Sequence, residues 1–154
     1  MDGYTIEKIE NSDKKSEIVN EILRDLPDWF GIEASLNEYV ESAKNLELWA
    51  AKNDVEIIGF VAIGATSEYT CEINSMGIKK EFHRKGIGRK LLSTAEKALK
   101  DKYKLIQVKT VDEGRYLEYD RTIAFYESMG FIRLEVFPSL WDDWNPCLVL
   151  VKQM

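Results

Sequence analysis

The 154-residue sequence is poor in the residues that cross-link a fold or bind metals. It has two cysteines, one histidine and three prolines. Cys71 and Cys147 lie too far apart in sequence for a zinc-binding pair, and His83, as the only histidine, excludes a site built from several histidines. We therefore expect no metal. Two reduced thiols, buried as small apolar groups, are typical of a cytoplasmic protein.

Long apolar runs are also missing from the chain. No stretch approaches the roughly 20 residues that a membrane-spanning helix needs, and the first residues lack the basic and apolar regions of a secretion signal. Hydrophobic residues make up 45% and charged residues 31% of the chain, a balance that excludes extensive disorder. We expect one domain over residues 1–154, in the cytoplasm and not associated with a membrane.

Positive charge is concentrated in one short segment. The net charge is −6, yet residues 79–90 hold six basic residues and one acidic residue, Glu81. A nonspecific nucleic-acid binder usually needs a broad basic surface, so the composition argues against nucleic acid as a partner. The segment favours binding of one compact anionic group, and the alternative interpretation is a solvated basic loop.

Hydrophobic periodicity predicts an α/β fold with a mixed sheet of six or seven strands and about four helices. Strands are expected at 4–10, 46–52, 56–65, 71–78, 103–111, 131–137 and 147–152, and helices at about 13–24, 34–44, 86–101 and 120–129. Turn residues between 46–52 and 56–65 predict a hairpin, and the strand–helix–strand unit over 71–111 predicts a parallel pair. Residues 138–146, which include Trp141 and Trp144, are expected to form a loop.

The segment Gly86-Ile87-Gly88 follows a predicted strand and begins the most strongly amphipathic predicted helix. The first turn of a helix leaves backbone N–H groups unpaired and carries about half a positive charge. Glycine lets an anion approach these groups, and neighbouring arginine and lysine side chains add positive charge. The pattern predicts a pyrophosphate-binding loop. It is not the loop of nucleotide hydrolases, which needs Gly-Lys-Ser/Thr, nor the dinucleotide fingerprint, because Leu91 stands where a third glycine is required.

Two motifs resemble a known family. Residues 84–92, RKGIGRKLL, resemble the acyl-CoA-binding motif of the GNAT superfamily of N-acetyltransferases, and residues 124–131, AFYESMGF, resemble its second motif. The resemblance covers about residues 46–152, and residues 137–148 also resemble a bacterial branch of unassigned substrate. It implies the GNAT-like acyl-CoA N-acyltransferase fold, acetyl-CoA as co-substrate, a small-molecule or peptide amine as acceptor, and a homodimer as one possible assembly.

The resemblance also implies which residues contact acetyl-CoA. Main-chain groups are expected to hold the pyrophosphate, and the pantetheine arm is expected to pair with a strand end. The pyrophosphate residues are His83, Arg84, Lys85, Gly86, Ile87, Gly88 and Arg89; the pantetheine residues are Met76, Gly77 and Ile78. Tyr119 is a further candidate contact. The sequence departs from the family at His83, where Gln or Arg is usual, and at Tyr119-Asp120, near which many relatives carry Asn.

The family resemblance further implies direct attack of a primary amine on the thioester, with Tyr126 as the general acid that protonates the departing thiolate. A backbone N–H near Met76 or Gly77 is the expected oxyanion donor. Glu72 resembles the glutamate that serves as base in histone-type members, and a salt-bridged strand glutamate is the alternative. Tyr126 as a core tyrosine also stays open. A module that binds or senses acyl-CoA without turnover is the second functional hypothesis.

Three aromatic residues complete the predicted site. Trp29, Phe30 and Tyr39 lie between and within the first two predicted helices, a region that covers the acceptor site in the family. We expect them to line a substrate pocket, with packing in the core as the alternative.

Overall fold

The computed structural model describes residues 3–142 and 144–154. These residues form seven strands, five α-helices and two short 3₁₀ turns. The strands are β1 (Thr5–Ile9), β2 (Glu47–Lys52), β3 (Ile57–Ala65), β4 (Thr70–Ile78), β5 (Leu105–Val111), β6 (Ile132–Asp142) and β7 (Asn145–Gln153). The helices are α1 (Ser12–Arg24), α2 (Pro27–Phe30), α3 (Glu33–Ser42), α4 (Ile87–Leu99) and α5 (Leu117–Ser128), with turns η1 (Ala43–Asn45) and η2 (Lys80–Phe82). None of the helices in the described residues is long and apolar enough to cross a membrane.

The strands form one sheet in the order β1-β2-β3-β4-β5-β7-β6. Strand β2 pairs antiparallel with β1 and β3, and β7 pairs antiparallel with β5 and β6. Strands β4 and β5 are parallel, with register from Thr70↔Leu105 to Ile73↔Val108. The predicted α/β class, the mixed sheet, the hairpin and the parallel pair are therefore confirmed.

Contacts divide the chain into two compact units, which we describe separately. The first unit contains residues 3–64 and 74–101, and the second contains residues 65–73 and 102–154. Strand β4 passes from the second unit into the first between Ile73 and Asn74.

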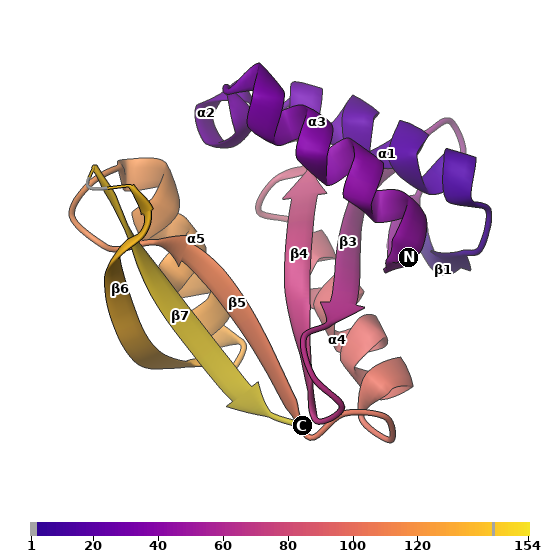
Figure 1. Ribbon diagram of the computed structural model, residues 1–154. Helices are drawn as coiled ribbons and strands as arrows, with labels where there is room; N and C mark the ends of the chain where they lie inside the picture. The colour runs from indigo at the N-terminus through magenta and orange to yellow at the C-terminus, as the bar shows by residue number, and fades with distance from the viewer. Residues whose placement is uncertain (1–2, 143) are drawn as a thin grey trace. The chain divides into compact units, whose positions relative to one another are not determined.

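Helices α1 and α3 pack together in the first unit (Figure 1). Asn11 caps α1, because its side chain accepts a hydrogen bond from the Lys14 backbone N–H at 2.9 Å. The apolar stripe of α1 then lies in a core that includes Val19, Ile22 and, from β3, Phe60, all fully buried. Burial of each such side chain stabilises the fold by about 1.5–3 kcal/mol.

Glycine permits close packing of β4 against α1. A Cβ atom on Gly77 would lie 2.9 Å from Leu26 Cδ1 and 3.0 Å from Ile22 Cγ2, closer than such atoms normally approach. Any larger residue at position 77 would therefore have to displace the side chains of Leu26 and Ile22, which pack against the end of the strand that leads into the glycine-rich loop.

The second unit is built on β5, β7 and α5. Ile106 and Val108 of β5 and Leu148 and Leu150 of β7 are buried, and α5 contributes Ile123. Gly130 ends the helix segment with a φ of +94°, a conformation that favours glycine, and its N–H donates to the Glu127 carbonyl at 3.0 Å. Gly130 thus directly follows Met129, the C-cap residue of α5.

Three element boundaries differ from the predictions. Residues 27–30, which lie between the first two predicted helices, form the short helix α2, and α5 begins at Leu117 rather than near 120. Strand β6 extends through Pro138 to Asp142, so the expected loop at 138–146 is wrong. An edge strand tolerates a proline because one side of it makes no sheet hydrogen bonds, which explains the extension.

Candidate functional site

The loop between β4 and α4 contains two residues in the left-handed region. Arg84 has a φ of +62° and Gly86 a φ of +77°. Glycine adopts this conformation freely, whereas an arginine is strained there by about 1–2 kcal/mol. Strained non-glycine residues occur often at ligand-binding loops. The loop therefore has the backbone geometry of a binding site rather than of an ordinary connection.

Gly86 is also the N-cap of α4, and no side chain makes a capping hydrogen bond there. The first intrahelical bond that reaches Gly86 comes from Lys90, whose N–H donates to the Gly86 carbonyl at 3.2 Å. Apart from the chain neighbours of Gly86, no atom of the described residues would lie within 4 Å of a Cβ atom placed there, so the described structure leaves open space in front of the helix start. An anion can therefore reach the positive end of the helix dipole.

The basic residues of this segment divide into two groups. Arg84, Lys85, Arg89 and Lys90 are exposed around the helix start. Lys79 instead pairs with Glu21 at 2.9 Å and with Glu56, and its side chain is 13% exposed. Four of the six basic residues thus present positive charge to solvent around the loop.

Burial alone would lower the pKa of Lys79, but its hydrogen bonds to Glu56 and Glu21 outweigh this effect and raise the pKa. Lys80 also contacts acidic residues. Its backbone N–H donates a hydrogen bond to Asp25 Oδ2 at 2.8 Å, and its ammonium group lies 3.7 Å from Asp28. These two lysines anchor the base of the loop to α1 and α2. Sequence reasoning missed this role, because the acidic partners are distant in sequence.

His83 holds the loop rather than extending into solvent. Its Nε2 donates to the Ile78 carbonyl oxygen at 2.6 Å, which requires the Nε2–H tautomer. Its ring packs edge-on against Trp29, with centroids 6.0 Å apart. The side chain is therefore occupied within the first unit, and only the main chain of His83 stays a prediction for phosphate contact.

The strand end expected to receive the pantetheine arm comprises Met76, Gly77 and Ile78. The carbonyl of Ile78 accepts the His83 hydrogen bond, and the next backbone N–H, of Lys79, donates to Ile58 at 2.9 Å. Immediately before this segment, Asn74 Oδ1 and Ser75 Oγ are buried with no hydrogen-bond partner in the described part of the chain. Buried polar atoms nearly always have partners, so these two atoms retain hydrogen-bonding capacity for a ligand. Sequence reasoning did not select either residue.

In the second unit, α5 carries both predicted tyrosines. Tyr126 is buried, at 6% exposed, and its ring packs edge-on against Phe131 with centroids 5.5 Å apart. Because α5 begins at Leu117, Tyr119 lies in its first turn, two turns before Tyr126, where its ring contacts Tyr116. Burial and aromatic packing restrict the Tyr126 side chain to few orientations.

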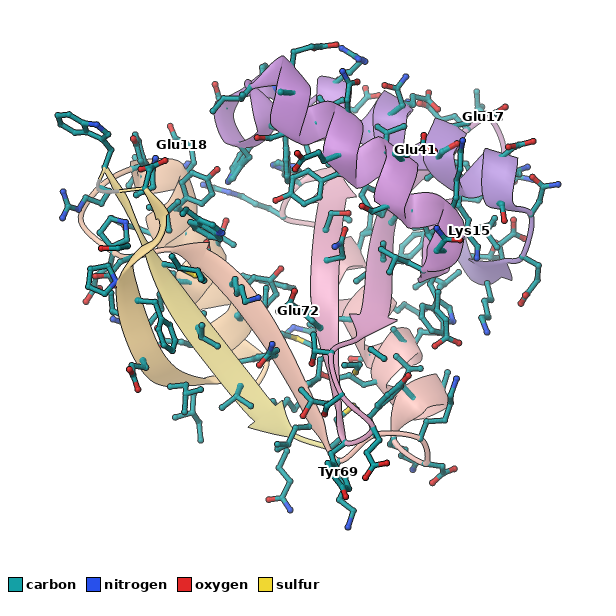
Figure 2. All side chains as sticks on the ribbon, in the orientation of Figure 1. Lys15, Glu17, Glu41, Tyr69, Glu72 and Glu118 are labelled. Carbon is teal, nitrogen blue, oxygen red and sulfur yellow. The ribbon has the colours of Figure 1, made fainter. Side chains whose placement is uncertain are left out.

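Glu72 lies on β4 with its side chain directed toward β5 (Figure 2). Its Oε1 accepts a hydrogen bond from Gln107 Nε2 at 2.8 Å and lies 3.1 Å from Lys109 Nζ. Its side chain is 19% exposed. Sequence reasoning identified Glu72 but missed Gln107 and Lys109. Alternation along β5 indicates that these two residues lie on the same face of the sheet. The sequence does not show that β5 pairs with β4, which brings them next to Glu72.

The two cysteines are buried free thiols, as expected. Burial raises the pKa of the Cys147 thiol; the nearby Lys109 lowers it and Glu72 raises it, both by smaller amounts. A raised pKa keeps the thiol neutral and unreactive at neutral pH.

The predicted acceptor-lining aromatics lie on α2 and α3. Trp29, Phe30 and Tyr39 are partly buried and pack against the core of the first unit. Phe30 and Tyr39 meet edge-on, with centroids 5.6 Å apart. All three residues thus pack against one core, with ring contacts in two pairs, Trp29 with His83 and Phe30 with Tyr39, and their use by a substrate stays a prediction.

A family model described as "Acetyltransferase (GNAT) domain" matches residues 44–133, more than half of the chain. A curated relative, an uncharacterised N-acetyltransferase of Chlorobaculum tepidum, is 32% identical over 96 residues. That match covers 60% of this chain and 56% of the relative, so the chain spans little more than half the length of the relative.

Solved structures share the fold at low sequence identity. A GNAT-family protein from Desulfovibrio desulfuricans is 17% identical with a TM-score of 0.81, over 97% of this chain and 98% of that one. A GNAT-family acetyltransferase from Elizabethkingia anophelis, solved with acetyl-CoA bound, is 21% identical with a TM-score of 0.73, over the full length of both chains. These likenesses support the fold.

Proposed function

This chain belongs to the GNAT acetyltransferase family, and on that premise we propose that it transfers the acetyl group of acetyl-CoA to a primary amine. The observation that carries the proposal is the start of α4, where Gly86 leaves open space before an uncapped helix N-terminus and exposed basic residues surround it. A helix start of this kind suits a diphosphate, because N–H groups and the helix dipole both favour negative charge. A bound acetyl-CoA in the Elizabethkingia anophelis relative supports the choice of ligand.

We propose that the main chain from His83 to Arg89 holds the pyrophosphate and that Met76, Gly77 and Ile78 pair with the pantetheine arm. The left-handed φ values of Arg84 and Gly86 support this assignment. Where right-handed and left-handed backbone conformations alternate along the chain, successive N–H groups point into one concave surface that can bind an anion. Tyr119, in the first turn of α5, is proposed as a further contact to the cofactor.

The proposed reaction is direct attack of the amine nitrogen on the thioester carbon. A lysine-like amine has a pKa of about 10.4, so the nucleophile must lose a proton, and Glu72 is the proposed base, acting through a water. The developing oxyanion is stabilised by a backbone N–H near Met76 or Gly77. The C–S bond then breaks, and Tyr126 donates its phenolic proton to the thiolate. A phenol with a pKa of about 10 is a suitable donor for this step.

We propose that Trp29, Phe30 and Tyr39 line the acceptor side, where an aromatic cluster favours an amine with apolar surface next to its nitrogen. Small-molecule amines and peptide amines both fit this description. Pairing with a second copy of the chain stays a prediction.

The direct test is release of free coenzyme A from acetyl-CoA in the presence of mixed libraries of small amines and peptides, with mass spectrometry of the acetylated product. Amine-dependent thiol release supports the proposal. Tight coenzyme A binding without thiol release above hydrolysis for any amine contradicts it and favours a module that binds acyl-CoA without turnover.

Two variants test the assigned roles. Tyr126→Phe removes the proton donor and is expected to lower turnover by at least about tenfold, with coenzyme A affinity unchanged. Wild-type turnover of this variant would exclude the acid role. Glu72→Gln is expected to flatten the rise of the rate with pH, and an identical profile would assign Glu72 a purely structural role.

A further inference from the structure

Glu72 is held asymmetrically in the second unit. Both of its contacts from β5, the Gln107 Nε2–H at 2.8 Å and the Lys109 ammonium at 3.1 Å, reach the same oxygen, Oε1. Gln107 is the register partner of Glu72 in the parallel pair, and Lys109 lies two residues further along β5 on the same face. One hydrogen-bond donor and one ammonium group on the same strand therefore contact one carboxylate oxygen.

The second oxygen of Glu72 differs from the first. Among residues 3–142 and 144–154, no hydrogen bond is donated to Oε2. The side chain is 19% exposed, so water reaches the carboxylate. The terminal torsion of a glutamate is broad and roughly two-fold, so an unrestrained carboxylate would exchange its two oxygens. With Oε1 held by the Gln107 hydrogen bond and the Lys109 ion pair, one oxygen is bound and the other is available to accept a hydrogen bond.

We infer that Lys109 and Gln107 are positioning residues, which fix Oε1 of Glu72 so that Oε2 accepts the proton released by the acceptor amine. This inference rests on the proposed function, in which Glu72 is the base. In the proton transfer, an N–H bond of the attacking amine breaks, the bridging water receives that proton, and the water passes a proton to Oε2. The Lys109 ammonium keeps its own protons throughout.

The energetic balance favours a geometric role over a stabilising one. The Lys109 side chain is 36% exposed, and ion pairs of this exposure contribute little to stability because water screens them. A displacement of a reacting group by about 1 Å, by contrast, costs up to about 100-fold in rate. Loss of Lys109 should therefore affect turnover far more than folding.

Lys109→Met is the main variant, because methionine keeps the apolar stem and removes the ammonium. We expect kcat to fall by about tenfold with the KM for acetyl-CoA unchanged. Lys109→Arg, which keeps the charge and the donors, should recover most of this loss. Lys104→Met is the matched control, an exposed lysine immediately before the same strand, and should leave kcat unchanged.

A double-mutant cycle separates positioning from a general structural effect. In a Glu72→Gln background, Lys109→Met should lower kcat by less than about twofold, because the group that it positions is already lost. An equal loss in both backgrounds would overturn the inference.

A measurement independent of turnover completes the test. The side-chain amide resonances of Gln107, assigned by their loss in Gln107→Leu, report its contact with Glu72. They should shift in Lys109→Met, and unchanged resonances would overturn the inference whatever the activity. If Glu72→Gln itself leaves turnover unchanged, the base assignment fails, and the amide shift still decides whether Lys109 fixes the carboxylate.

Discussion

Gly86 gives the sharpest test of the pyrophosphate loop, because conformation, size and charge can be varied there one at a time. Its φ is +77°, and a Cβ atom there would meet no atom of the described residues within 4 Å apart from its chain neighbours, so the cost of a substitution is conformational rather than steric at Cβ. Gly86→Asn and Gly86→Asp are nearly equal in shape and both tolerate the left-handed region better than most residues. The two variants therefore differ mainly by one negative charge in front of the helix start.

The magnitude follows from Coulomb's law. Two unit charges about 6 Å apart repel by about 0.7 kcal/mol in bulk water and by about 2.8 kcal/mol at the effective dielectric near a protein surface. These energies correspond to a weakening of about 3-fold to about 100-fold in the dissociation constant. The conformational cost of a non-glycine residue, about 1 kcal/mol, lowers the stability of both variants and shifts the unfolding midpoint by about 3 °C.

Calorimetric titration with coenzyme A measures the effect without knowledge of the acceptor. Gly86→Asp should bind more weakly than Gly86→Asn by the factor above. Gly114→Asp is the matched control, since Gly114 also has a positive φ (+85°) and open space but lies in the loop before α5. It should lose similar stability and bind coenzyme A normally. Equal affinities for the two Gly86 variants, or equal weakening by Gly114→Asp, would refute the assignment of the loop.

Three further predictions concern strain, ion pairing and thiol burial. Arg84→Gly should raise stability by about 1 kcal/mol in thermal unfolding, by relief of the left-handed strain, yet weaken coenzyme A binding through loss of a cation; a less stable variant would contradict the strain. Hydrogen bonding to Arg133 lowers the pKa of Glu113, so this pair contributes stability above about pH 4.5 and loses it as pH falls through the lowered pKa. Arg133→Met should therefore lower the unfolding midpoint at pH 7 but not at pH 2.5, and an equal decrease at both would exclude the ion pair as the cause. Burial raises the pKa of Cys147, so thiol reagents should modify it at pH 8 only after unfolding; rapid reaction of the native protein would contradict its burial.

The elements that depend on local pattern could be predicted from the sequence. Helix α4 was expected at 86–101 and lies at Ile87–Leu99, because its apolar residues keep helical spacing and a glycine stands at its start. The hairpin of β2 and β3 follows from Asn53, whose side chain accepts hydrogen bonds from the N–H groups of Val55 and Glu56. In both places, the residues that decide the structure are neighbours in sequence.

The parts that sequence analysis missed depend on partners distant in sequence. Periodicity cannot show that Lys79 meets Glu21, 58 positions away, or that Gln107 donates to Glu72, 35 positions away. Helix α5 begins before its expected start without a side-chain cap, so no capping residue marks its first turn. The glycine-rich loop was predictable as a motif, whereas the contacts that hold it were not.

Those contacts explain how the fold maintains a strained residue in this loop. Arg84 has an unfavourable conformation, and two residues before it are fixed: His83 by its ring to the Ile78 carbonyl, and Lys80 by its backbone N–H to Asp25. Each hydrogen bond contributes about 1 kcal/mol net, more where a charged group takes part, which is enough together to offset the strain of one residue. A loop held in this way loses little conformational freedom when an anion binds, so more of the electrostatic attraction remains as affinity. The prediction at Arg84 follows from the same reasoning, because glycine there removes the strain while the anchors stay in place.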